Sequence, residues 1–309
     1  MDKLPSVYII ILNWNRLGDT LSCLESIETI SKTGFDLHVL VVDNGSTDGS
    51  VETLKKYKGD GFILSIIENR ENLGFAAGNN IGIEYAIKEA ADFLLVLNND
   101  TLVDKNLLKE FLVAAKKYPQ VGIFTPKIYF AKGFEFKKKY KEEDLGKVIW
   151  SAGGDIDWNN VYATNRHVDE VDSKRLDKDT DSDFATGAAM FLRAEVVKKY
   201  GNFDERYFMY FEDVDLCERY KRVGGKIMYV SKCRLWHKVA QSSGIGSDLN
   251  DYFISRNRLL FGMGYAPLRT KMALYKESVK FLLNGRVWQK KGVVDFYTAN
   301  FGKGSWKFK

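Results

Sequence analysis

Carboxylate side chains near the ends of apolar segments have the clearest capacity for chemistry in this sequence. Asp43 directly follows one apolar segment, Asp100 lies shortly after another, and Glu212 and Asp213 follow an aromatic run. An Asp beyond a buried strand can present oxygen to a hard cation that bridges phosphate oxygens. A carboxylate can also accept the proton of an attacking hydroxyl. Such positions could bind a cation on phosphate oxygens, although Asp100 before Thr101 would equally suit a helix cap.

Motifs of several other enzyme classes are absent from the sequence. It contains no G-x-x-x-x-G-K-[ST] phosphate loop and no G-x-S-x-G nucleophile turn. Its three histidines are scattered and give no local support for a hydrolytic triad. P-loop enzymes and serine hydrolases are therefore disfavoured.

An alternation of strands and helices must position these carboxylates. Short β-branched or apolar runs predict buried strands, and apolar residues at helical spacing predict the helices between them. Such alternation predicts a parallel sheet covered by helices, with ligands beyond the carboxyl ends of its strands. Polar loops at 13–15, 43–50 and 98–100 would then meet at one crevice. The predicted strands are 7–12, 37–42, 62–67 and 93–97, and the predicted helices are 21–30, 50–58 and 75–90.

The pattern weakens after residue 120. We expect strands at 188–192 and 226–230, and a helix from Glu212 to Val223 that stops at two glycines. The polar segment 165–183 is expected to be a mobile loop. The resulting division is a domain over 1–245, with halves 1–120 and 121–245, followed by an amphipathic helical extension over 246–309.

Charge is distributed unevenly along the chain. The 309 residues carry 46 Lys and Arg against 41 Asp and Glu, but residues 251–309 carry 12 basic and 3 acidic residues, a balance of +9. The basic residues of this tail are mixed with Leu, Phe, Trp and Met, which suits an interfacial helix better than a nucleic-acid contact. We expect the tail to touch an anionic membrane peripherally. The alternative is that it packs on the body or mediates oligomer contacts.

The location of the protein in the cell can also be inferred from the sequence. Three cysteines without C-x-x-C spacing indicate neither a zinc site nor a disulfide framework. The N-terminus lacks the pattern of a signal peptide, and no apolar run approaches the roughly 18 residues of a spanning helix. We therefore expect a cytoplasmic protein, peripheral on the cytoplasmic face of the membrane.

Five ordered motifs together resemble family 2 glycosyltransferases of the GT-A fold, in particular the rhamnosyltransferase-like branch. The similarity runs from about residue 6 to residue 240. It implies an α/β fold with a mainly parallel, Rossmann-like sheet flanked by helices and a C-terminal helical extension. The motifs are I-L-N-W-N (11–15), V-V-D-N-G-S-T-D-G-S (41–50), N-L-G-F-A-A-G-N-N (72–80), L-N-N-D-T (97–101) and F-E-D-V-D-L-C-E-R (211–219).

The resemblance implies a nucleotide-sugar site at the first two motifs and at the fourth. Asn13, Trp14, Asp43 and Asn44 correspond to positions that hold the base and ribose, although Asp43 and Asn44 before a glycine would also suit a tight turn. In the fourth motif, Asn99 and Asp100 are the corresponding residues. The expected donor is dTDP-rhamnose or, as second choice, a UDP-sugar.

A divalent metal, Mg²⁺ or Mn²⁺, is also implied. The family's Asp-x-Asp corresponds to Asn98-Asn99-Asp100, so one carboxylate is replaced by an amide and the metal would rely on diphosphate oxygens and water. His237 in R-L-W-H resembles a metal-binding histidine of some relatives. A packed, hydrogen-bonded histidine beside Trp236 is the alternative.

Glu212 and Asp213 match the family's Glu-Asp motif, whose Asp is taken to be the general base. Displacement of the diphosphate by a sugar hydroxyl deprotonated in this way would invert the anomeric centre. The alternative is that both residues only complement a helix dipole.

The resemblance also points to residues on the acceptor side. Gly153, Gly154, Gly187 and Ala188 correspond to such positions, unless they serve only turns and close packing, and Trp158 could stack on a sugar ring.

Together, these features predict an inverting, metal-dependent hexosyltransferase that acts on a glycan or lipid-linked acceptor in polysaccharide biosynthesis of the cell envelope. A non-catalytic nucleotide-sugar or glycan-binding module of the same fold is the alternative. A nucleotidyltransferase is disfavoured because Asn13-Trp14-Asn15-Arg16 is not a glycine-rich phosphate loop.

Overall fold

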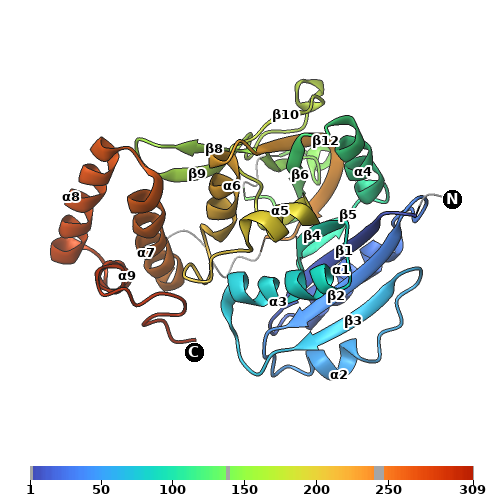
Figure 1. The fold of residues 1–309 in the computed structure, drawn as a ribbon, viewed down its shortest axis with the longest axis horizontal. Helices are drawn as coiled ribbons and strands as arrows, with labels where there is room; N and C mark the ends of the chain where they lie inside the picture. The colour runs from blue at the N-terminus through green and yellow to red at the C-terminus, as the bar shows by residue number, and fades with distance from the viewer. Residues whose placement is uncertain (1–2, 137–139, 240–246, 309) are drawn as a thin grey trace.

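A ten-stranded mixed sheet lies at the centre of the computed structural model, which describes residues 3–136, 140–239 and 247–308 (Figure 1). Its main path has the order β10-β12-β6-β11-β4-β1-β2-β3, with β5 beside β12 and β7 beside β6. The strands of this sheet are β1 (Ser6–Asn13), β2 (Asp36–Asp43), β3 (Ile63–Glu68), β4 (Phe93–Asn98), β5 (Thr101–Val103), β6 (Val121–Phe130), β7 (Ile149–Ala152), β10 (Thr180–Asp181), β11 (Ala189–Arg193) and β12 (Lys226–His237).

The first half of the sheet is parallel, as the sequence predicts. Strands β3, β2, β1 and β4 lie side by side in parallel register and end close to the predicted positions. The helices between them are α1 (Leu17–Glu28), α2 (Ser50–Leu54) and α3 (Gly74–Lys88), which confirms the three predicted helices. The polar segments after β1, β2 and β4 therefore lie at one edge of the sheet.

Side chains of the central strands alternate between two hydrophobic cores. Ile10 and Val96 belong to the core that also includes Ile83 of α3, whereas Ile9 and Leu97 belong to the core that includes Leu24 of α1. Successive residues of a strand point to opposite faces, so a strand covered by helices on both faces is apolar throughout. This is why the strands have continuous apolar sequences.

The second half of the sheet departs from the parallel pattern. Strand β11 is antiparallel to both β4 and β6, and β12 returns parallel to β6. The predicted strands 188–192 and 226–230 correspond to β11 and to the first part of β12. Helices α4 (Leu107–Lys117), α5 (Ala194–Tyr200) and α6 (Glu212–Arg222) accompany these strands, and α6 confirms the helix predicted from Glu212.

Segment 165–183 differs from the predicted mobile loop. It contains a short 3₁₀ helix (Lys174–Leu176) and β10, which pairs with β12. The ammonium of Lys127, fully buried in β6, lies 3.0 Å from Asp172 and 2.9 Å from Asp177. A buried cation needs such partners, so the segment covers Lys127 and is attached to the sheet by it. Its acidic residues thus have a structural role, which could not be inferred from composition alone.

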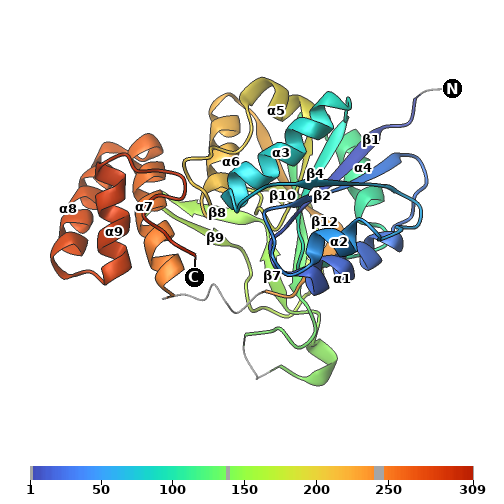
Figure 2. The same ribbon diagram turned by 90° about the horizontal axis from the view of Figure 1, so that it is seen from below.

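Smaller elements complete this side of the molecule. A two-stranded sheet of β8 (Gly154–Asp157) and β9 (Tyr162–Asn165) lies between the main sheet and the C-terminal helices (Figure 2). A further 3₁₀ turn spans Glu142–Asp144.

Three helices form the predicted C-terminal helical region. They are α7 (Asp248–Tyr265), α8 (Leu268–Asn284) and α9 (Val287–Tyr297), and they group at one end of the molecule (Figure 2). Phe261 of α7 shares a core with Leu216 of α6, so this region packs on the α/β part. The predicted boundary at 245–246 lies outside the described residues. Within the described ranges, no helix combines the length and apolarity needed to cross a bilayer.

Candidate active site

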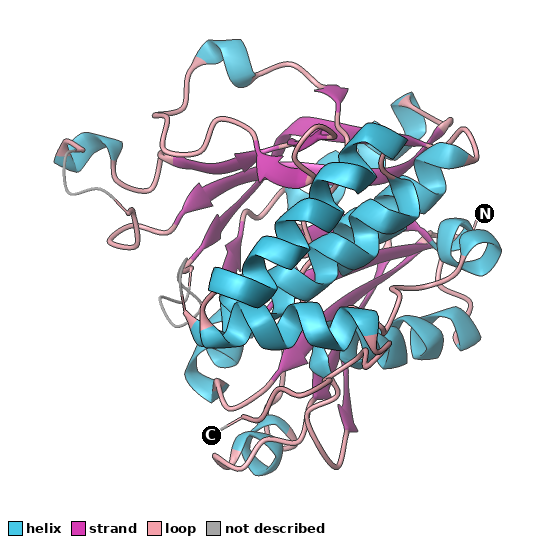
Figure 3. Ribbon diagram, turned by 90° about the vertical axis from the view of Figure 1, so that its left-hand side faces the viewer, coloured by secondary structure: helices cyan, strands magenta, loops and turns pink. Residues whose placement is uncertain are grey.

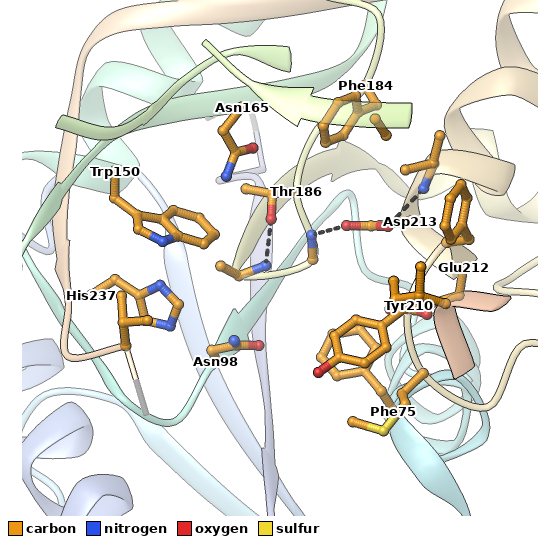
Figure 4. A pocket seen from close by; sticks show the side chains of 18 of the residues that line it. Phe75, Asn98, Trp150, Asn165, Phe184, Thr186, Tyr210, Glu212, Asp213 and His237 are labelled. Carbon is orange, nitrogen blue, oxygen red and sulfur yellow. Dashed lines mark hydrogen bonds between the residues drawn. The ribbon is translucent and has the colours of Figure 1, made fainter. Parts of the chain in front are cut away.

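A cavity of about 450 Å³ opens at the carboxyl ends of β4 and β12. Figure 4 shows Trp150, Asn98 and His237 on one side of it and Asp213, Glu212 and Tyr210 on the other. The segment before β11 lies between the two sides. Six residues predicted to be functional line the cavity: Asp100, Gly187, Ala188, Glu212, Asp213 and His237.

Asp100 and His237 form one wall of the cavity, which we call the strand-end wall. His237 is the last residue of β12, and it pairs with Thr101 of β5, next to Asp100. The His237 Nε2 atom lies 2.9 Å from the Asp100 Oδ1 atom, although 137 residues separate the two. The Trp150 ring packs edge-on against the imidazole, with centroids 4.6 Å apart. Sheet pairing therefore brings the two predicted metal ligands together.

The donor atoms of this wall suit a divalent cation. A carboxylate oxygen and an imidazole nitrogen are a set that Mn²⁺ accepts, while Mg²⁺ prefers oxygen. The His237 Nδ1 atom is buried without a hydrogen-bond partner among the described residues. No group of three or more His, Cys, Asp or Glu that could hold a metal occurs in the described part of the chain. A bound cation would therefore need further ligands from the donor diphosphate and water.

Asp213 and Glu212 begin α6 and form the opposite wall, which we call the base wall. The Asp213 Oδ2 atom accepts a 2.8 Å hydrogen bond from the Gly187 backbone, and its Oδ1 atom accepts one of 2.8 Å from Val214. Glu212 is buried, and its Oε2 atom has no hydrogen-bond partner among the described residues. Both carboxylates line the cavity from the first turn of α6, and their catalytic roles remain predictions.

Burial changes the acidity of both carboxyl groups. It raises the pKa of Asp213, and the two backbone N–H groups that stabilise the carboxylate counteract this only in part. The pKa of Glu212 is raised well above its usual value by burial and by the neighbouring charge of Asp213. A carboxylate with a raised pKa is a stronger base, which suits proton abstraction from a hydroxyl.

The segment that leads to Asp213 has an unusual backbone. Phe208, Tyr210 and Phe211 all have positive φ angles, of 65°, 68° and 76°. Residues with a Cβ rarely adopt this left-handed region, so the surrounding structure must hold them there. Phe208 also approaches α3 so closely that a Cβ on Gly74 would lie 2.7 Å from the Phe208 carbonyl oxygen.

Asn257 of α7 holds this segment from behind. Its Nδ2 atom lies 2.8 Å from each of three carbonyl oxygens, those of Tyr207, Met209 and Tyr210. The Asn257 side chain is fully buried, and its Oδ1 atom accepts a 2.9 Å hydrogen bond from Arg256. The C-terminal helices thus support the base wall, which the charge pattern of the sequence did not suggest.

Arg256 extends the same support. Its guanidinium is fully buried and donates to the carbonyls of Tyr207 at 3.0 Å, Arg206 at 3.2 Å and Gly302 at 2.6 Å. A buried guanidinium is tolerated because backbone oxygens surround it. Sequence reasoning counted Arg256 among the basic residues of a membrane-facing tail, and the structure shows instead that it points into the protein.

The residues predicted to hold the nucleotide form a hydrogen-bonded chain beside the cavity. Asn99 donates to Thr20 at 2.9 Å, Thr20 to Asn13 at 2.7 Å and Asn13 to Asp43 at 2.7 Å. Asp43 also accepts a 2.8 Å bond from the Ser46 backbone. These bonds join the ends of β1 and β2 to the turn after β4. The predicted nucleotide contacts remain predictions.

Asn44 ties the end of β2 to the segment before α3. Its Nδ2 atom donates to Asn72 Oδ1 at 3.0 Å and to the Gly74 carbonyl at 3.1 Å, and its Oδ1 atom accepts from Asn69 at 3.0 Å and from Leu73 at 3.2 Å. The side chain is therefore saturated by the protein. These hydrogen bonds would shape a nucleotide site by fixing its backbone, without contact between Asn44 and the nucleotide.

Trp14 lies beside the C-terminal end of the described chain. Its ring packs edge-on against Phe308, with centroids 4.8 Å apart, and Phe308 also contacts Phe208. The chain terminus thereby reaches both a predicted nucleotide contact and the base wall. No sequence pattern indicated this contact.

The predicted acceptor residues divide into two groups. Gly187 and Ala188 line the cavity between its two walls, whereas Gly153, Gly154 and Trp158 do not line it. Gly154 begins β8 and packs so closely on Phe184 that a Cβ would meet its ring at 2.2 Å, and Trp158 stacks on Phe261 of α7. Acceptor contacts of these three residues remain predictions, since the structure shows packing roles.

Several cavity residues were missed by sequence reasoning. Trp150, Phe75, Tyr210 and Phe184 supply aromatic surface, and Asn165 supplies polar atoms beside Thr186, which the resemblance had already placed on the acceptor side. Aromatic faces beside polar groups suit sugar rings, which have apolar faces and hydroxyl edges. Phe75 lies in the motif at 72–80 and Tyr210 in the aromatic run before Glu212, whereas no sequence signal pointed to Trp150, Phe184 or Asn165.

Comparison with known proteins decides the family of this chain. Residues 8–201 match the model described as Glycosyl transferase family 2. The chain belongs to this family. It is a glycosyltransferase, and its fold is GT-A.

Curated relatives of the chain include rhamnosyltransferases. The chain is 26% identical over 216 residues to N-acetylglucosaminyl-diphospho-decaprenol L-rhamnosyltransferase of Mycobacterium tuberculosis, covering 67% of this chain and 68% of that protein. It is 25% identical over 232 residues to Rhamnosyltransferase WbbL of Escherichia coli K12, covering 72% of this chain and 80% of that protein.

Solved structures share the fold at low sequence identity. S. aureus TarS in complex with UDP-GlcNAc superposes with a TM-score of 0.58 at 14% identity, covering 94% of this chain and 79% of that one. GalNAc-T7 with UDP, GalNAc and Mn²⁺ superposes with a TM-score of 0.61 at 15% identity, covering 96% and 58%. A divalent metal is thus seen in a protein of this fold.

Proposed function

We propose that this glycosyltransferase moves a sugar, with inversion, from a nucleoside diphosphate donor to a hydroxyl of a lipid-linked glycan. One observation carries the proposal: a single cavity holds a carboxylate–imidazole pair on one wall and a carboxylate of raised pKa on the other. Inverting displacement needs its base and its leaving group on opposite faces of the sugar, and the two walls offer these positions.

Asp213 is the general base of the proposed reaction. The acceptor hydroxyl oxygen attacks the anomeric carbon and gives its proton to the Asp213 carboxylate. The bond from the anomeric carbon to the diphosphate oxygen breaks, and the nucleoside diphosphate leaves with the electron pair. The Gly187 and Val214 N–H groups hold the carboxylate in place. Burial and the neighbouring charge of Asp213 raise the pKa of Glu212, which favours a neutral Glu212 beside the ionised base.

Asp100 and His237 would hold the divalent cation, Mg²⁺ or Mn²⁺. A cation bound there neutralises charge that develops on the diphosphate. The donor atoms at this wall and the Mn²⁺ in a structure of the same fold support this assignment. Asn13, Trp14, Asp43, Asn44 and Asn99 would shape the adjoining nucleotide site, and Gly187 and Ala188 the acceptor side.

The donor and acceptor are proposed from the relatives. Two are named as rhamnosyltransferases, one of them for a decaprenol-linked acceptor, which supports dTDP-rhamnose as donor and a polyprenyl-linked glycan as acceptor. A UDP-sugar is the second choice, supported by the UDP-GlcNAc complex of TarS. We also propose peripheral contact of the C-terminal region with the cytoplasmic face of a membrane, where such acceptors are held.

A transfer assay with purified full chain tests the proposal. Asp213→Asn should lower kcat by about 10² to 10⁴ fold, the range expected for loss of a general base. The control is Asp157→Asn, an exposed carboxylate in β8 outside the cavity, which should retain activity. EDTA should abolish transfer by the unmodified enzyme, and added Mn²⁺ should restore it. Full activity of Asp213→Asn would disprove the base, and donor binding without turnover on any acceptor would indicate a binding module instead.

A further inference from the structure

Helix α8 presents an apolar stripe to solvent. Its exposed apolar residues include Leu268 at 74%, Met272 at 55%, Tyr275 at 56% and Leu283 at 69% relative exposure. Val279 and Leu282 complete the stripe at the same spacing of three and four residues. At about 100° per residue these six side chains fall within a strip about 100° wide. An exposed stripe of this size is uncommon on a surface that faces only water.

The opposite face of α8 already has its partners. Thr270, Leu274 and Ser278 are buried, and Ser278 forms a 2.7 Å hydrogen bond with Tyr297 of α9. The stripe therefore points away from the protein. Figure 1 shows α8 as the outermost helix at one end of the molecule, and Figure 3 views that end.

Positive charge borders the stripe on both sides. Lys271 lies along one edge, and Arg269, Lys276 and Lys280 lie along the other. Glu277 is the single acidic residue of α8, and it points inward to Arg258 at 2.7 Å. Among the described residues, no carboxylate forms an ion pair with these four cations. The outward face thus combines an apolar strip with cationic edges.

We propose that this face of α8 docks on an anionic lipid bilayer, parallel to its surface. Apolar side chains would enter the boundary between headgroups and acyl chains, while the bordering cations meet anionic headgroups. A second copy of the chain is a poorer occupant, because a two-fold contact through this stripe would bring the four cations of each copy together. The docking surface is inferred from the exposure and charge of α8. Its purpose, access to lipid-linked acceptors, rests on the proposed function.

Vesicle binding by the full chain tests the docking face without any measurement of transfer. The protein should co-sediment with vesicles of equal parts phosphatidylcholine and phosphatidylglycerol, and much less with phosphatidylcholine alone. The Met272→Asp/Leu283→Asp variant should bind the anionic vesicles at least about tenfold more weakly, since it places two charges in the apolar boundary. Its control is Ile63→Asp/Val113→Asp, which changes two exposed apolar residues of β3 and α4 and should bind like the unmodified protein.

The cationic edges are tested separately. Lys276→Glu/Lys280→Glu should weaken binding by more than about tenfold at low salt, because it removes two attractive charges near the anionic surface and adds two repulsive ones. Lys109→Glu/Lys116→Glu on α4 is the matched control. Transfer to a short soluble acceptor should be unchanged in all four variants, so loss of docking is separable from failure of the proposed reaction. Absence of binding to anionic vesicles, equal binding by the α8 and α4 variants, or a dimer that the α8 variants dissociate would each overturn the proposal.

Discussion

The strand-end wall and the base wall of the cavity are positioned by different means. Asp100 and His237 lie where strands end, and backbone pairing between β5 and β12 places them side by side. Asp213 follows a left-handed aromatic segment whose carbonyls are held by Asn257, 47 residues after Tyr210. One wall therefore depends on backbone pairing between strands, and the other on a few buried side chains. We therefore expect that substitution of one buried side chain can disturb the base wall and leave the strand-end wall intact.

The largest expected effect is on the support of the base wall. Asn257→Leu removes the amide nitrogen that three carbonyl oxygens share. Arg256 still donates to the Tyr207 carbonyl, but the carbonyls of Met209 and Tyr210 lose this donor, at a cost of about 1 to 3 kcal/mol for each unsatisfied group. Displacement of Asp213 by about 1 Å should lower kcat about 10² fold. Calorimetry should show unchanged affinity for the donor nucleotide with Mn²⁺.

Asn250→Leu is the control, since Asn250 is a half-buried residue at the start of the same helix. It should retain kcat. If Asn257→Leu weakens nucleotide affinity and leaves kcat intact, the two walls are not supported independently.

A smaller effect is expected at the strand-end wall. Asp100→Asn keeps the shape of the side chain but removes the carboxylate that faces His237 at 2.9 Å. The Mn²⁺ concentration for half-maximal activity should rise about tenfold or more, because an amide oxygen is a weaker ligand for a hard cation. The thermal unfolding midpoint should stay unchanged, since backbone pairing positions this wall. A strong loss of stability with unaltered Mn²⁺ dependence would contradict the comparison.

The smallest expected effect is on stability at the base wall. Burial raises the pKa of Glu212 above its value in the unfolded chain, so its contribution to stability is full at low pH and is lost as pH rises through the raised pKa. Glu212→Gln cannot ionise, and it should therefore unfold less readily than the unmodified protein at neutral pH.

The difference in stability between Glu212→Gln and the unmodified protein should disappear at about pH 3, where Glu212 is protonated in both the folded and the unfolded state. Denaturant unfolding at several pH values measures this. An equal effect at all pH values would indicate that packing, not ionisation, decides the stability at this position.

Much of the parallel half of the fold was predictable because its strands are buried on both faces. Continuous apolar runs such as those of β1 and β4 are typical of strands covered by helices on both sides, and their polar ends predicted the edge where ligands bind. The order of strands in the second half was not predictable, because β11 and β12 join partners far away in sequence. Segment 165–183 was wrongly expected to be mobile, since nothing in its composition reveals that it covers the buried Lys127.

The candidate site shows the same limit. The motif residues Asp100, His237 and Asp213 were identified from sequence, and the structure places all three on one cavity. Trp150 and Asn257 were not identified, because neither belongs to a motif and both act through contacts with distant segments. The basic tail was interpreted as one surface, yet Arg256 points inward and Lys276 outward.

By itself, the sequence determined which residues are available for chemistry and the local elements that carry them, since apolar periodicity and strand-end polarity are local properties. Only the tertiary structure decided which of these residues meet, how the backbone before Asp213 is held in a left-handed conformation, and which face of α8 is left exposed. The physical reason is that these features depend on pairing and packing between residues distant in sequence, and a local sequence pattern does not specify those contacts.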